Sequence, residues 1–200
     1  TKKALGTARH ATSATVAGGG FLNLNLLDPL NTLTLGSGST SSTTIAGTLT
    51  NNGTLTFVAD ASGNNVPGGI DQRLFIPGGT TATLAGTGAL VLNGTETGVQ
   101  GAASSGANTS TLVNAAGHTI RSSGTLQQLV LDNAGTFTVT NAITLDDVKA
   151  GGTGIYNVDA GATLTLTNST VLNTTINGTS GAIAGTGGTL QDVTTTGTLT

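Results

Sequence analysis

The 200-residue chain contains no cysteine, methionine or tryptophan, and only one tyrosine and three prolines. Without cysteine it can form neither a disulfide framework nor a thiolate metal site. Only 8% of the residues are charged, and six lysines and arginines face nine acids. So few cations cannot build the basic surface that neutralises nucleic-acid phosphates. No run of about 18 apolar residues is present either. We therefore expect no nucleic-acid partner and no membrane span.

The residues that are abundant favour strands and turns. The chain holds 42 threonines, 32 glycines and 48 residues of Leu, Ile, Val or Phe. Threonine and valine favour the pleated surface of a sheet, whereas glycine and asparagine favour turns. Glutamate occurs once, and no window shows apolar residues at helical spacing. Short stretches alternate instead, for example at 136–140 (TFTVT) and 163–167 (TLTLT). The sequence predicts an all-β chain.

Similar segments recur along the chain at irregular intervals. Thr-Leu-x-x-Leu or Thr-Leu-x-x-Val occurs at 125–129, 144–148 and 189–193, with a looser copy at 170–174. A period of about 20 to 25 residues is that of one coil of a parallel β-solenoid. We expect about eight or nine irregular rungs, with Leu and Val inside and Thr outside. A β-sandwich, which also uses short Thr-rich strands, remains the alternative.

The repeat pattern suggests a division of the chain. Residues 1–20 lack the pattern and are expected to form a linker or terminal cap, and 21–200 the solenoid, with loop insertions near 58–79 and 95–110. Insertions in solenoids often lie on the binding face, so Arg73 and Phe75 in the first loop are candidate partner contacts. The chain begins without methionine and ends in a predicted strand. We expect it to be part of a longer protein.

Two segments carry a resemblance to a known group of proteins. Residues 111–126 (TLVNAAGHTIRSSGTL) and 129–139 (LVLDNAGTFTV) resemble the coils of filamentous-haemagglutinin-like and autotransporter-type bacterial adhesins. The resemblance implies a right-handed parallel β-helix that is exported to the cell exterior, where it acts as a stalk, a fibre or an adhesive surface. The Asn-Pro-containing secretion motifs of the two-partner-secretion group are missing here.

The sequence offers no arrangement of residues typical of catalysis. Asp146 and Asp147 are neighbours on a predicted strand, so their side chains would point to opposite faces. Asp147 and Asp192 share one slot of the repeat, but Gln128 fills it in another copy, which indicates a solvated position. His118 lies beside a glycine turn and is expected at the surface. Residues 151–156 (GGTGIY) lack the aspartate that a calcium-binding β-roll requires. We predict no catalytic residue, no metal site, no cofactor and no enzymatic activity.

Three functions from different classes fit these observations. The first is a bacterial cell-surface or secreted structural and adhesive protein, which would self-associate end to end into filaments or bind a host-cell, matrix or surface ligand. The second is an ice-binding protein that uses outward Thr-x-Thr triplets, which start at 32, 48, 54, 81, 136, 163 and 198. Their uneven spacing is expected to scatter them over several faces. The third and weakest is a carbohydrate-active β-helix, which would need paired acids and stacked aromatics.

Overall fold

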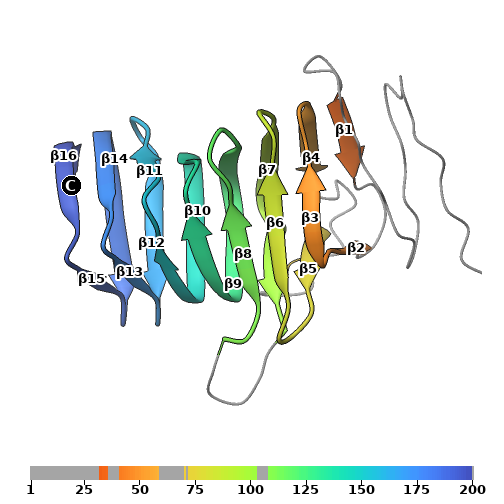
Figure 1. Ribbon diagram of the computed structural model, residues 1–200. Helices are drawn as coiled ribbons and strands as arrows, with labels where there is room; N and C mark the ends of the chain where they lie inside the picture. Colours follow the sequence, from red (N-terminus) through yellow and green to blue (C-terminus); the bar gives the residue numbers. More distant parts are fainter. Residues whose placement is uncertain (1–31, 36–40, 59–69, 71, 103–107, 200) are drawn as a thin grey trace, which may run out of the picture.

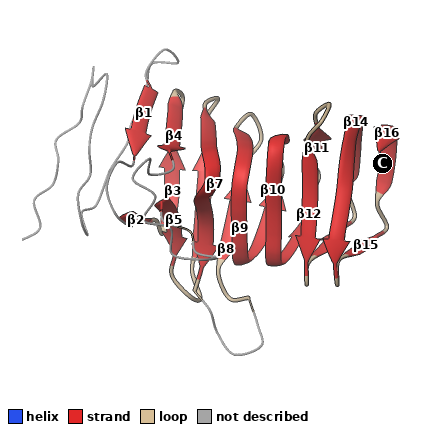
Figure 2. Ribbon diagram, turned by 180° about the vertical axis from the view of Figure 1, so that it is seen from behind, coloured by secondary structure: helices blue, strands red, loops and turns tan. Residues whose placement is uncertain are grey.

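The computed structural model describes residues 32–35, 41–58, 70, 72–102 and 108–199, and these contain sixteen β-strands and no helix (Figures 1 and 2). The predicted all-β class is therefore confirmed. The strands are β1 (Thr32–Leu35), β2 (Ser41–Thr44), β3 (Gly47–Thr50), β4 (Thr54–Val58), β5 (Gln72–Ile76), β6 (Thr81–Ala85), β7 (Ala89–Gly101), β8 (Thr111–Asn114), β9 (Thr119–Asn133), β10 (Thr136–Gly151), β11 (Ile155–Val158), β12 (Thr163–Thr167), β13 (Thr170–Leu172), β14 (Thr175–Thr186), β15 (Thr189–Gln191) and β16 (Thr194–Leu199).

All strand pairs are parallel and form three ladders. The first ladder runs β1-β4-β7-β9-β10-β11-β14-β16. The second runs β2-β5-β7-β9-β10-β12-β14. The third runs β3-β6-β8-β9-β10-β13-β15. The long strands β9 and β10 contribute to all three ladders, because they bend between one ladder and the next.

Successive strands of the first ladder show where the chain carries extra residues. From β9 to β16 their first paired residues lie 17 to 20 positions apart, whereas the steps from β4 to β7 and from β7 to β9 take 35 and 30. The stretches expected to be insertions, 58–79 and 95–110, fall within these two long steps. The expectation is nevertheless wrong for Gln72–Ile76, which form β5, and for residues 95–101, which belong to β7. Residues 59–69, 71 and 103–107 of the two insertions, and the expected linker at 1–20, lie outside the described residues.

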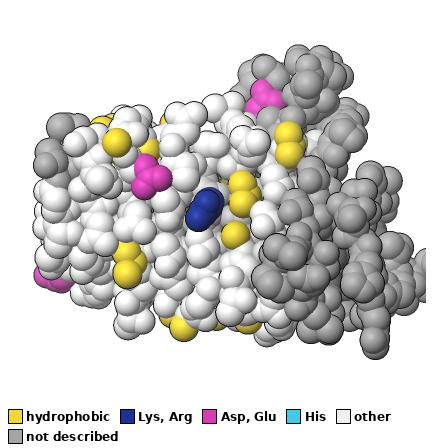
Figure 3. Space-filling view, turned by 90° about the horizontal axis from the view of Figure 1, so that it is seen from above, with side chains coloured by type: hydrophobic (Ala, Val, Ile, Leu, Met, Phe, Trp, Pro, Cys, Tyr) yellow, Lys and Arg dark blue, Asp and Glu magenta, His cyan; other side chains and the backbone are white. Residues whose placement is uncertain are grey.

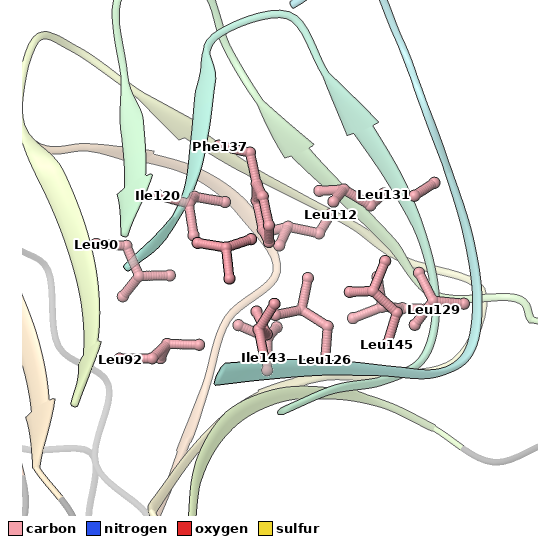
Figure 4. Packing of buried hydrophobic residues seen from close by; sticks show 14 of the residues in the cluster. Leu90, Leu92, Leu112, Ile120, Leu126, Leu129, Leu131, Phe137, Ile143 and Leu145 are labelled. Carbon is pink, nitrogen blue, oxygen red and sulfur yellow. The ribbon is translucent and has the colours of Figure 1, made fainter. Parts of the chain in front are cut away.

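The core consists of apolar side chains stacked in register. The first ladder stacks Leu90, Ile120 and Phe137, and the second stacks Leu126 and Leu145, all of them buried. Figure 4 shows these side chains converging from different strands on one interior. Each large apolar side chain removed from water contributes about 1.5–3 kcal/mol. The predicted separation of leucine inside and threonine outside is confirmed in β12, where Leu164 and Leu166 are buried between half-buried threonines.

Residues with positive φ mark two of the bends between ladders. Gln128, Asp147 and Asn168 occupy equivalent places between the second and third ladders, with φ between 47° and 56°. Asn173 and Asp192, with φ of 50° and 53°, lie between the third ladder and the first. Asparagine and aspartate, which supply four of these five residues, tolerate this left-handed conformation better than most residues. The Thr-Leu-x-x segments therefore turn the chain, and they do so at two different corners.

Candidate functional site

The candidate contact residues Arg73 and Phe75 lie on β5, in the second ladder, and not on a loop. Both are half-buried and alternate with the buried Leu74, so they occupy the outer side of the ladder. The Arg73 guanidinium donates a hydrogen bond from Nη1 to Gln100 Oε1 at 2.7 Å. Phe75 is in register with Thr44 on one side and with Gln100 on the other. We call Arg73, Phe75 and Gln100 the Arg73 patch.

A second feature lies beside this patch. Ile70 is only 8% exposed, yet it does not belong to the main core cluster. It packs against Gly98, where a Cβ atom would lie 2.8 Å from Ile70 Cδ1 and 2.3 Å from the backbone oxygen of Thr125. Gly98 is in register with Arg73. Ile70, two positions before the start of β5, is thus anchored next to the Arg73 patch, where only glycine at position 98 leaves it room.

His118 is buried, so the expectation of a surface histidine is wrong. It occupies the position just before a first-ladder strand. Glycine holds this position before the neighbouring strands of the ladder, at Gly88 before β7 and Gly135 before β10. A Cβ atom at either glycine would lie 2.2 Å from a backbone oxygen. The imidazole is enclosed with three asparagines that are also buried, namely Asn51, Asn114 and Asn133. We call these four residues the polar corner.

The hydrogen bonds of the polar corner have a defined direction. Asn114 Nδ2 donates to Asn133 Oδ1 at 2.7 Å and to the Thr136 carbonyl at 3.1 Å, so its Oδ1 is the acceptor for His118 Nδ1 at 2.8 Å. His118 Nδ1 therefore carries the proton, and Nε2 accepts from Asn51 Nδ2 at 3.3 Å. The chain of bonds is complete only with a neutral imidazole, because a second ring proton would meet the Asn51 donor.

Burial, like the hydrogen bonds, favours the neutral form of His118. Desolvation lowers the pKa of the imidazole from 6.5 to about 4. At neutral pH the ring is uncharged and joins Asn114 to Asn51, which are far apart in sequence. No signal within residues 111–126 reveals this environment, because Asn51 lies 67 positions away. The polar corner satisfies buried groups and is a structural element of the fold.

The described aspartates of the Thr-Leu-x-x segments do not converge. Asp147 and Asp192, which share a slot of the repeat, lie at two different corners, and both are exposed. Asp146 is half-buried on the outer side of the second ladder, in register with Gln127 and Thr167. Within the described residues, no three His, Asp or Glu side chains are grouped as a metal site would require. The same part of the chain has no helix long and apolar enough to cross a membrane.

The Thr-x-Thr triplets are distributed over all three ladders, as expected. Those starting at 32, 54 and 136 share the first ladder, although the intervals between them are uneven. The one starting at 163 lies on the second ladder, and those at 48 and 81 lie on the third. On the first ladder, Val91 and Arg121 lie between the ranks of Thr56 and Thr138. The face shown in Figure 3 is mostly neither charged nor hydrophobic.

Comparison with known proteins gives no relative: no family model, no curated protein and no solved structure matches this chain.

Proposed function

We propose that the chain folds as a right-handed parallel β-helix and serves as a structural and adhesive part of a bacterial cell-surface or secreted protein, without catalytic activity. The three continuous parallel ladders carry this proposal. Strands of a sheet lie about 4.8 Å apart, so the eight strands of the first ladder extend the molecule by about 34 Å along the stack. A stack of this kind lengthens by adding rungs, as a stalk or fibre must.

The outer surface supports an adhesive role more than a catalytic one. Only Arg73, Arg121 and Lys149 supply positive side chains to the described residues, and the exposed carboxylates are dispersed. The Arg73 patch combines a guanidinium, an aromatic ring and an amide on one side of a ladder. Arginine and aromatic residues are the types that most often anchor protein contacts. We propose this patch as the contact with a host-cell, matrix or surface ligand.

The strands nearest the C-terminal end of the described residues could pair with a further strand, either from a continuing chain or from another copy. Among the described residues, β15 pairs only with β13, and β16 pairs only with β14. Leu190 is in register with the buried Val171, yet it is 43% exposed. An edge strand with unpaired backbone groups can accept a further strand. End-to-end stacking of several copies into filaments belongs to the proposed function.

Surface display tests the adhesive role. Bacteria that carry the chain on an outer-membrane anchor are compared with anchor-only cells for attachment to polystyrene and to fibronectin-coated glass. We expect increased attachment that falls with Phe75→Thr and Arg73→Gln, since both changes keep the strand but remove the ring and the cation. Thr165→Ala, on the outer side of the same ladder, is the matched control.

Two results would contradict the proposal. Attachment equal to that of anchor-only cells on both surfaces would remove the adhesive role. Equal attachment by the wild type and by a variant that carries both Phe75→Thr and Arg73→Gln would rule out the Arg73 patch as the contact. Negative-stain electron microscopy of the purified protein tests stacking separately, because particles of a single size at every concentration would exclude filaments.

A further inference from the structure

The same tripeptide, Asn-Gly-Thr, occurs at three places in the described structure. The copies begin at Asn52, Asn93 and Asn177. An asparagine followed by glycine is prone to cyclise, because no Cβ atom on the next residue obstructs the approach of its backbone nitrogen. Since the tripeptides are identical, differences in reactivity between them must come mainly from the fold. The chain thus contains its own controls for a chemical modification.

The reaction needs only water. The backbone nitrogen of the glycine loses its proton and attacks the asparagine Cγ, a C–N bond forms, the Cγ–Nδ2 bond breaks, and ammonia leaves. Water then adds to one of the two carbonyls of the succinimide ring, which gives either aspartate or isoaspartate. The side chain must be free to rotate toward the next nitrogen, and that nitrogen must be free to lose its proton.

The copy at Asn52 is restrained at both reacting groups. Asn52 Oδ1 accepts a hydrogen bond from the backbone N–H of Thr87 at 3.0 Å. The nucleophile, the nitrogen of Gly53, donates to Asn51 Oδ1 at 3.1 Å, and Gly53 is buried. Cyclisation here would break both bonds and disturb the rung beside the polar corner.

The copy at Asn177 is restrained by neighbouring strands. Asn177 Nδ2 donates to Asn157 Oδ1 at 3.2 Å, and its Oδ1 accepts from Thr196 Oγ1. Gly178 lies inside the paired part of β14, in register with Val158 and Gly197. Neither the side chain nor the backbone can approach the ring geometry without opening the first ladder.

The copy at Asn93 differs in the freedom of its side chain and in the strand pairing of its glycine. Asn93 is exposed, and its side chain makes no hydrogen bond to any described residue. It is the last residue of its paired stretch, since pairing between β7 and β9 resumes only at Gly98. Gly94 has a φ of 130°, outside the regular strand range. Two restraints remain on Gly94. Its nitrogen, the nucleophile, donates a hydrogen bond to Ser123 Oγ at 3.2 Å, and its carbonyl oxygen accepts one from Thr97 Oγ1 at 2.8 Å.

We infer that Asn93–Gly94 is a site of spontaneous deamidation in the folded protein, controlled by the hydrogen bond to Ser123. The product adds a negative charge at the end of the first-ladder stretch of β7. In the isoaspartate form it also lengthens the main chain there by one carbon atom. The modification is independent of any ligand and goes beyond the proposed structural role.

Trypsin separates the three copies. Cleavage after Arg9, Arg73, Arg121 and Lys149 places Asn52, Asn93 and Asn177 on different peptides, 10–73, 74–121 and 150–200. The folded protein is incubated at mildly alkaline pH, digested at intervals, and examined by mass spectrometry for the exchange of NH2 for OH. We expect peptide 74–121 to convert first, with fragmentation placing the change at Asn93. In guanidinium chloride, the three rates should converge.

Variants test the control by Ser123. Ser123→Ala should accelerate conversion at Asn93 by roughly fivefold, the rate equivalent of one net hydrogen bond. Thr138→Ala, on the outer side of the same ladder, should leave the rate unchanged, and Asn93→Gln should suppress the product. The inference is overturned if peptide 10–73 or 150–200 converts as fast as 74–121 in the folded protein. It is equally overturned if only the unfolded chain converts, or if the change maps to Asn108 or Asn114.

Discussion

The stability of this protein should depend on pH through His118. The pKa of the imidazole is 6.5 in an unfolded chain and about 4 in the folded protein, so the unfolded state binds a proton more readily in between. Stability is therefore complete above the unfolded value and falls as the pH drops from about 6.5 toward 4. Each pKa unit corresponds to about 1.4 kcal/mol, so the loss attributable to His118 is about 3 kcal/mol.

His118→Gln isolates this contribution. A glutamine amide can donate to Asn114 Oδ1 and accept from Asn51 Nδ2, so it can replace both bonds without titrating. Urea unfolding followed by circular dichroism, between pH 4 and pH 7.5, gives the free energy of unfolding of both proteins. We expect the difference between wild type and variant to change by about 3 kcal/mol over this range. The difference isolates His118, because all other titrating groups are common to both proteins.

A difference in free energy of unfolding between wild type and variant that does not change with pH would refute the argument. If wild type and His118→Gln lose stability in parallel between pH 6.5 and pH 4, the imidazole is either accessible to water or already protonated in the folded state. The spectroscopic signal of Tyr156, the only tyrosine of the sequence, gives a local check. Tyr156 is buried in the core on β11, two first-ladder strands beyond β9, which His118 precedes. Its hydroxyl donates a hydrogen bond to the Gly151 carbonyl at 2.9 Å. Burial, followed by the nearby Asp132 carboxylate, raises the pKa of its phenol.

Three further predictions concern stability and use the same urea assay. Ser122 Oγ is buried and has no hydrogen-bond partner among the described residues, so Ser122→Ala should raise the free energy of unfolding by about 1 kcal/mol. Ser169→Ala removes a hydroxyl bonded to backbone groups of Leu145, Thr167 and Val148, and should lower it by about 1–3 kcal/mol. The reverse order would contradict the hydrogen-bond assignment. Leu145→Ala, which truncates a buried side chain, should lower the free energy of unfolding by about 2–5 kcal/mol. Leu190 is partly exposed, so Leu190→Ala should lower it by less than about 1 kcal/mol. Equal losses would mean that the side chain of Leu190 is covered. Gly135→Ala should lower the free energy of unfolding by about 1–3 kcal/mol, because the new Cβ would lie 2.2 Å from the backbone oxygen of His118. An unchanged free energy would show that the backbone at His118 can move away.

The local pattern of the sequence was sufficient to predict strands and their two sides. In Thr163–Thr167 the alternation of leucine and threonine gives the observed burial directly, because side chains on a strand point to opposite faces in turn. The same pattern is present in Gln72–Ile76, where Leu74 and Ile76 are buried. It was missed because the neighbouring prolines, glycines and charged residues are typical of a loop.

The side chains of the candidate site required the tertiary structure. The Thr-Leu-x-x segments look equivalent in sequence, but Asp147 and Asp192 turn the chain at different corners, and this depends on how many residues each preceding turn contains. His118 is a polar residue beside a turn, and its burial is favourable because Asn114 and the sequence-distant Asn51 bond its two ring nitrogens. The sequence by itself determined the all-β class and the separation of apolar from polar faces, because both follow from neighbours one or two positions apart. The register of the ladders, the polar corner and the exposure of Asn93 were decided by the tertiary structure, because they depend on contacts between residues far apart in the chain.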